Sequence, residues 1–192
     1  MIRKLTEKDY VTSSWSGGKT VQIAISPEGA VYADRDFSFR VSSATVELPE
    51  SDYTSLPDYD RLITPISGEM FLSHDGAPEE EVEPFEIHAF DGASKTHCRG
   101  ICTDFNLMTR KGKTRGMMSA LDIDPDSAVM LYPVEKNQTV VLYLAFGSAR
   151  LLAGDEEIEL SEGESLFITD ETTEMALESE EGATFALACA EE

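Results

Sequence analysis

Apolar and polar residues alternate over short segments along almost the whole chain, which is the pattern of β-strands with one buried face. In residues 37–42, for example, Phe37, Phe39 and Val41 fall on one face and polar residues fall on the other. Turn sequences such as that of residues 73–76 separate many of these segments. The expected strands lie at 21–25, 37–42, 62–66, 69–73, 85–90, 103–108, 139–144, 149–152, 157–160, 165–169, 174–178 and 184–188.

Helical periodicity is absent from every long segment of the chain. Only residues 51–59 and 120–122 are expected to form short helical turns. Short strands with a turn about every 8–12 residues are typical of sandwiches and barrels. The pattern therefore predicts an all-β fold.

The two halves of the chain follow the same order of elements. A segment around Gly68 can be laid over one around Gly147, and each continues through a second strand to an acidic-Gly turn. The first half also carries an acidic insertion at 77–84. Because this hairpin pattern is typical of cupins, we predict two double-stranded β-helix (cupin-like) barrels per chain, a bicupin. The N-terminal barrel, with the candidate pocket, is expected at 1–110, a linker at 111–117 and the C-terminal barrel at 118–192.

Charge narrows the possible partners. The 192 residues include 15 Lys plus Arg and 37 Asp plus Glu, a formal net charge of −22. Such a charge repels nucleic acids and anionic membranes. The longest apolar runs, such as 140–146, are far too short to span a bilayer, and the N-terminus lacks the apolar stretch of a secretory signal. Three cysteines make no disulfide framework, so we expect a cytoplasmic protein.

Histidines and cysteines offer little recognisable chemistry. The three histidines, His74, His88 and His97, form no His-x-His pair, and His74 is expected in a solvated turn. A site of two histidines and one carboxylate, built from His88 and His97, stays open, but we expect neither a bound metal nor another cofactor. Cys98 and Cys102 are too far apart for a bridge if they lie on one strand.

Two arginines and one strand supply better candidates. Arg40 lies between core positions, so its side chain either enters the barrel, where an anionic ligand would balance it, or pairs with a surface acid. The same alternatives apply to Arg61. On the strand at 103–108, Asp104 and Asn106 share one face and would form a polar wall if that face points inward.

Several of these motifs resemble those of the HutD/Ves family. The resemblance covers residues 15–110 well, and the second half matches only in architecture. The matching segments are Trp15-Ser16-Gly17-Gly18-x-Thr20, Phe37-x-Phe39-Arg40-Val41-Ser42-x-Ala44, Ser55-x-Pro57 with Asp60-Arg61, Gly68, and Thr103-Asp104-Phe105-Asn106-Leu107-Met108-Thr109-Arg110.

This resemblance implies a small, metal-free bicupin linked to histidine utilisation or stress response. It further implies that the protein binds a small carboxylate, such as urocanate or a formylglutamate-like compound, with no established enzymatic activity and no catalytic residue. The ligand-binding residues it implies are Trp15, Ser16, Gly17, Gly18, Arg40, Ser42, Arg61, Asp104 and Asn106. The chain departs from the family pattern at Lys111, where an arginine is usual, and in its acidic insertion.

Three functions compete at this point. The first is a carboxylate-binding bicupin that modulates histidine utilisation or a related pathway. The second is a cupin-type isomerase or hydrolase with His88 or His97 as general acid-base. The third is a non-catalytic interaction module with an acidic face, and a homodimer is compatible with all three. The tight Gly17-Gly18 turn has two interpretations as well, a packing turn around Trp15 or a backbone rim of the pocket.

Overall fold

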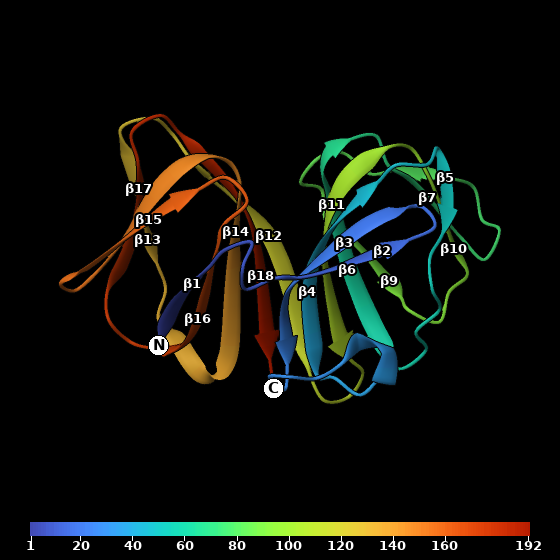
Figure 1. Ribbon diagram of the computed structural model, residues 1–192, viewed down its shortest axis with the longest axis horizontal. Coiled ribbons are helices and arrows are strands. Elements are labelled where there is room, and N and C mark those ends of the chain that lie inside the picture. Colours follow the sequence, from blue (N-terminus) through green and yellow to red (C-terminus); the bar gives the residue numbers. More distant parts are fainter. The chain divides into compact units, whose positions relative to one another are not determined.

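The computed structural model describes all 192 residues and is built almost entirely of β-strands, which confirms the predicted all-β class. Two compact units divide the chain (Figure 1). The N-terminal unit comprises Tyr10–Met117, and the C-terminal unit comprises Met118–Glu192 together with Met1–Asp9. The only helix is the 3-10 turn η1 (Tyr32–Asp34), and no helix is long and apolar enough to cross a membrane.

Two sheets form the N-terminal unit. The larger sheet has the order β2 (Val11–Trp15), β3 (Gly18–Ser26), β4 (Phe39–Val46), β11 (Cys102–Arg110), β6 (Tyr59–Gly68) and β9 (His88–Asp91). The smaller sheet has the order β5 (Glu50–Asp52), β10 (Thr96–Arg99), β7 (Phe71–His74) and β8 (Glu80–Glu81). Part of the acidic insertion thus becomes an edge strand, β8, of the smaller sheet.

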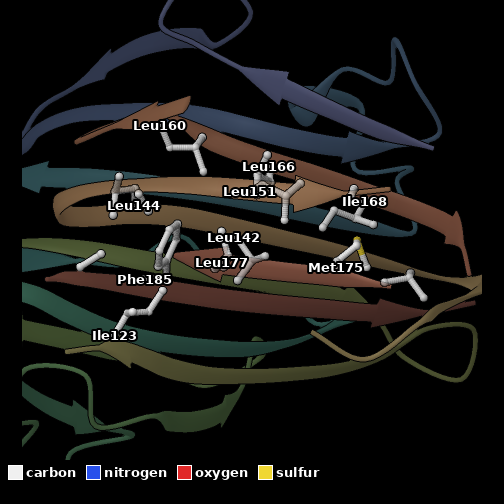
Figure 2. Close-up of a cluster of buried hydrophobic side chains, with 14 residues drawn as sticks. Ile123, Leu142, Leu144, Leu151, Leu160, Leu166, Ile168, Met175, Leu177 and Phe185 are labelled. Carbon is white, nitrogen blue, oxygen red and sulfur yellow. The ribbon is translucent and has the colours of Figure 1, made fainter. Parts of the chain in front are cut away.

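The C-terminal unit is built around one long strand, β14 (Val134–Ala153). Its first part pairs with β16 (Ser165–Glu171) and β18 (Ala183–Glu191), and its last part pairs with β15 (Glu156–Ser161) and β17 (Met175–Ser179). The remaining strands are β1 (Ile2–Leu5), β13 (Ser127–Leu131) and β12 (Arg115–Ile123), which begins in the N-terminal unit. Figure 2 shows side chains from several of these strands, among them Leu142, Leu151, Leu166, Leu177 and Phe185, packed into one dry core.

The predicted equivalence of Gly68 and Gly147 is confirmed by the backbone. Both residues have a φ of +86°. A Cβ on Gly68 would lie 2.2 Å from the Ile101 carbonyl oxygen, and a Cβ on Gly147 would lie 2.2 Å from the Gly182 carbonyl oxygen. Only glycine tolerates this conformation together with this approach. A glycine of positive φ packed against a backbone carbonyl therefore occurs at the equivalent position of each half.

Three expectations about the organisation were wrong. Residues 1–9 were expected in the N-terminal barrel, but β1 pairs with β16, so a pairing across more than 160 residues places them in the C-terminal unit. The expected linker at 111–117 is a turn followed by the start of β12. The helical turns expected at 51–59 and 120–122 are absent. Residues 51–52 belong to β5, and residues 120–122 all belong to β12.

Candidate functional site

A row of polar side chains lines one face of the larger N-terminal sheet. In the register, Arg40 on β4 lies opposite Met108 on β11, which lies opposite Arg61 on β6. Two residues further along β4, Ser42 lies opposite Asn106 on β11. Directly paired residues of antiparallel strands point to the same face, so the alternation on each strand brings these groups together. Asp104 follows on the same face.

All five predicted polar residues of this row are buried. Arg40 is 5% exposed and Arg61 is 6% exposed. Ser42, Asp104 and Asn106 are at most 5% exposed. The face therefore points into the protein, and the interpretation of Arg40 or Arg61 as a surface arginine is wrong.

Arg40 is held by neutral groups alone. Its Nε donates to Gln22 Oε1 at 2.9 Å, and its Nη1 donates to Ser42 Oγ at 3.2 Å. The centre of the Tyr32 ring lies 4.3 Å from the guanidinium carbon of Arg40. The same ring lies 4.0 Å from the guanidinium carbon of Arg35, the residue that ends the 3-10 turn. No carboxylate lies within ion-pair distance of Arg40, and burial lowers its pKa to about 10.

The Arg61 guanidinium has fewer hydrogen-bond partners than that of Arg40. Its guanidinium lies over the rings of Tyr53 at 5.0 Å and Phe90 at 4.9 Å. Its single hydrogen bond runs from Nη2 to Asn106 Oδ1 at 3.4 Å, and the buried Nε has no partner. Burial lowers the pKa of this group too. A buried guanidinium without an anion is expensive, because nothing replaces the solvation it has lost.

Asp104 is the one carboxylate of the row. Its Oδ1 accepts hydrogen bonds from the Ala44 backbone at 3.2 Å and from Asn106 Nδ2 at 3.4 Å. Burial nevertheless raises its pKa to about 6, and the hydrogen bonds and the two arginines offset only part of that effect. Two buried cations thus face a single carboxylate, so the site is locally positive in a strongly acidic chain.

The Trp15-Ser16-Gly17-Gly18 turn joins β2 to β3 and has a packing explanation. A Cβ on Gly17 would lie 2.0 Å from the Trp15 ring, and one on Gly18 would lie 1.9 Å from the Thr45 carbonyl oxygen. Trp15 packs against the apolar cluster that also contacts Tyr53 and Phe90. Ser16 is exposed and forms no hydrogen bond. The structure therefore joins Trp15 to the surroundings of Arg61 and explains the two glycines without a ligand.

Sequence reasoning missed several residues of the site. Gln22 binds Arg40, and the aromatic rings of Tyr32, Tyr53 and Phe90 cover the guanidinium groups. Gln22 and Phe90 could have been found, since each alternates with its strand neighbours. Tyr32 lies on a 3-10 turn and Tyr53 on a loop, where no periodicity assigns a face.

Arg110, which ends the matching motif, and Lys111, which follows it, act outside the row. Arg110 donates to the carbonyl oxygens of Arg35 at 2.6 Å and Phe37 at 3.1 Å, so it fixes the segment that carries Tyr32. Lys111 binds the Pro57 carbonyl at 2.8 Å and the Asp91 carboxylate. The departure from the family pattern at Lys111 is therefore part of a surface ion pair.

The histidines fall into two groups. His97 points outward and bonds Asp52 at 2.9 Å, and this bond raises its pKa. His74, expected in solvent, is half-buried instead: its Nδ1 contacts Thr96 Oγ1 at 2.9 Å and its Nε2 contacts Nε2 of His88 at 2.8 Å. His88 and His97 do not meet, and no three His, Cys, Asp or Glu side chains gather as metal ligands. The two-histidine-plus-carboxylate site is therefore wrong.

The C-terminal unit offers an opposite electrostatic environment. A hollow of about 560 Å³ is lined by Asp126, Glu159, Glu178 and other acidic residues, with a single arginine, Arg150. Arg150 is already paired with Glu178 at 3.2 Å. This hollow therefore repels anions.

Comparison with known proteins fits these motifs. The HutD family model matches residues 7–187. The chain belongs to the HutD family. A curated relative of this HutD chain is an uncharacterised 21.2 kDa protein encoded in the hutC 3′ region of Pseudomonas putida. It is 26% identical over 162 residues, 82% of this chain and 81% of that protein.

Solved structures agree with the fold of this HutD-family chain. A conserved protein of unknown function from Pseudomonas aeruginosa PAO1 is 22% identical, with a TM-score of 0.84, and HutD from Pseudomonas fluorescens SBW25 is 23% identical, with a TM-score of 0.76. Each comparison covers both chains completely. The bacterial pirin YhhW from Escherichia coli, 10% identical over 98% of both chains, has a TM-score of 0.70. The fold is therefore cupin-like.

Proposed function

We propose that this HutD-family protein binds a small carboxylate metabolite and thereby modulates histidine utilisation or a related pathway. The observation that carries the proposal is the pair Arg40 and Arg61, both buried and neither within ion-pair distance of a carboxylate. Asp104 is the single carboxylate near these two guanidinium groups, although the chain has 37 acidic residues. A planar carboxylate from outside meets the same need with bidentate hydrogen bonds.

The site also offers groups that would orient such a ligand. The free Nε of Arg61 can donate to one carboxylate oxygen, and Ser42 and Asn106 can bond an amide or imidazole group. Tyr32, Tyr53 and Phe90 cover the guanidinium groups with aromatic rings, an arrangement that favours a small, flat ligand. We also propose that each unit is one cupin-like barrel and that this ligand site belongs to the N-terminal one.

Family context suggests which carboxylates to try first. The P. putida relative is encoded beside hutC, and the P. fluorescens HutD structure was obtained in a formate condition. Urocanate and formylglutamate are therefore the candidate metabolites, and formate is the minimal probe. These contexts support the choice of compounds, and the two arginines support the chemistry.

Calorimetry and thermal unfolding with these three anions test the proposal. Ligand at 100 times its Kd should stabilise the protein by about 2.7 kcal/mol. Arg61→Met and Arg40→Met should abolish the effect, whereas Arg99→Met, an exposed arginine paired with Glu79, should keep it. Methionine fills a similar volume without the charge, so the site variants should stay folded. Unchanged binding in both site variants would refute the proposal, and so would the absence of binding by all three anions.

A further inference from the structure

A pair of buried thiols lies directly behind the proposed anion site. Cys98 is 0% exposed and Cys102 is 4% exposed, and both belong to the apolar cluster that contacts Trp15, Tyr53 and Phe90. Both cysteines are free. The prediction that they are too far apart assumed a single strand, and the structure contradicts that assumption.

The chain changes sheets between the two cysteines. Cys98 lies on β10 of the smaller sheet, opposite Leu72 on β7, and Cys102 begins β11 of the larger sheet, opposite Gly68. The turn between them depends on Gly100, which has φ +123 and where a Cβ would lie 2.0 Å from the Glu69 carbonyl oxygen. This reversal directs both side chains into the same cluster between the sheets.

The two thiols share one buried cluster and are electrostatically unequal. The pKa of Cys98 is lowered, chiefly because the Cys102 thiol donates a hydrogen bond to it. The pKa of Cys102 is raised by the same bond and by burial. Cys98 is thus the thiol that ionises first and attacks an oxidant, and Cys102 is the thiol that resolves the product.

Tyr53 connects this pair to the anion site. Its buried hydroxyl has no hydrogen-bond partner, its side chain packs against the cluster that contains both cysteines, and its ring lies 5.0 Å from the Arg61 guanidinium carbon. Burial, followed by the charge of Asp104, raises the pKa of Tyr53, so this residue stays neutral. A change in the sulfur positions would move the ring that covers Arg61.

We propose that Cys98 and Cys102 form a reversible intramolecular disulfide that lowers the affinity of the neighbouring site for its anion. With a hydroperoxide as oxidant, the Cys98 thiolate attacks one peroxide oxygen, the O–O bond breaks, and Cys98 becomes a sulfenic acid while the other oxygen takes up a proton and departs as water or an alcohol. The Cys102 sulfur then attacks the sulfenic sulfur and water departs, so two thiols are oxidised and one peroxide is reduced. A dithiol reverses the reaction by exchange.

The second half of this inference rests on the proposed function, and the first half does not. Formation of the bond joins the two sheets at the point where the chain crosses between them, and β11 also carries Asp104 and Asn106. Loss of the Tyr53 contact with Arg61 should weaken anion binding by roughly 3- to 30-fold, the range expected for one cation–π interaction.

The experiment begins with Cys189→Ser, which removes the third thiol. The folded variant is treated with hydrogen peroxide, and peptide mass spectrometry follows the disulfide. We expect both thiols to be lost together, with a mass 2 Da lower, the loss of two hydrogens, and full recovery in dithiothreitol. Cys102→Ser in the same background should give only a sulfenic or over-oxidised Cys98. Because that variant could misfold, peptide mapping of the untreated and treated wild type provides the same answer without a mutation at the pair.

Formate affinity of the reduced and oxidised forms then completes the test. Weaker binding after oxidation, restored by dithiothreitol, supports the coupling. A folded protein whose two thiols stay reduced, or are oxidised without joining, overturns the inference even if formate binds. A disulfide with unchanged formate affinity overturns the coupling to the site. A disulfide in a protein that binds no anion in either state refutes the proposed function and leaves the thiol pair established.

Discussion

Replacement of Asp104 by asparagine tests the electrostatics of the site most directly. Burial raises the pKa of this carboxyl from 3.8 to about 6. If the anion binds only when Asp104 is protonated, its apparent Kd at pH 7.5 should be ~30-fold higher than below pH 5. Asp104→Asn mimics the protonated form and keeps an oxygen for the Ala44 and Asn106 donors. The variant should therefore bind formate tightly at every pH from 5 to 7.5.

The same variant should change the stability of the protein with a defined sign. Because the pKa is higher in the folded state, that state binds more protons between pH 4 and 6, and stability from this group falls as the pH rises through that window. The shift of about two units corresponds to roughly 3 kcal/mol for this fully buried group. Asp104→Asn should thus raise the free energy of unfolding at pH 7.5 by up to ~3 kcal/mol, and leave it nearly unchanged at pH 4.

Calorimetry with formate at pH 5, 6 and 7.5 and urea unfolding at the same pH values provide both readouts. Formate stays ionised throughout, so its own titration adds little. Asp104→Asn retains every other titratable group of the chain, so the difference between the two profiles isolates Asp104. If the variant binds formate with the wild-type pH slope, or is less stable than the wild type at pH 7.5, the electrostatic reasoning is wrong.

Three further predictions concern stability. Gly18→Ala should cost about 1–3 kcal/mol in urea unfolding, because its Cβ would meet a backbone oxygen, whereas Gly29→Ala, at φ +84 in open space, should cost less. Leu151→Ala should cost about 2–5 kcal/mol in the same assay, and Leu152→Ala, on the half-buried opposite face, clearly less. Burial and then the charge on His88 lower the pKa of His74 in the folded state, so the wild type should lose stability as the pH falls below 6.5. His74→Gln should reduce this loss, and an unchanged dependence of the free energy of unfolding on pH would contradict the prediction.

The candidate site was predictable as far as each strand determines it alone. Side chains alternate with a period of two, so the shared faces of Arg40 with Ser42 and of Asp104 with Asn106 follow from the sequence. The register that sets β4 beside β11 spans some 60 residues and has no local signal. Which face points inward depends on the smaller sheet, and this is why Arg40 had two open interpretations.

For the fold too, the sequence predicts single strands better than it predicts how they pair. Strongly alternating segments such as 103–108 became strands, since their apolar faces specify one buried side, whereas only the second half of 85–90 did so. The pairing of β1 with β16 was missed, because four residues with two adjacent basic ones carry little pattern. Residues 50–52 were missed for a similar reason. Their pairing with β10 is a tertiary contact that overrides a weak local preference for a turn.

Burial of the arginines also bears on the functions that the sequence left open. A protein partner could not reach Arg40 or Arg61, which are 5% and 6% exposed, so an interaction module would leave their charges unexplained. Asp104 is the one carboxylate near both guanidinium groups, so the two charges are compensated only in part within the chain. The proposed anion would supply the missing negative charge.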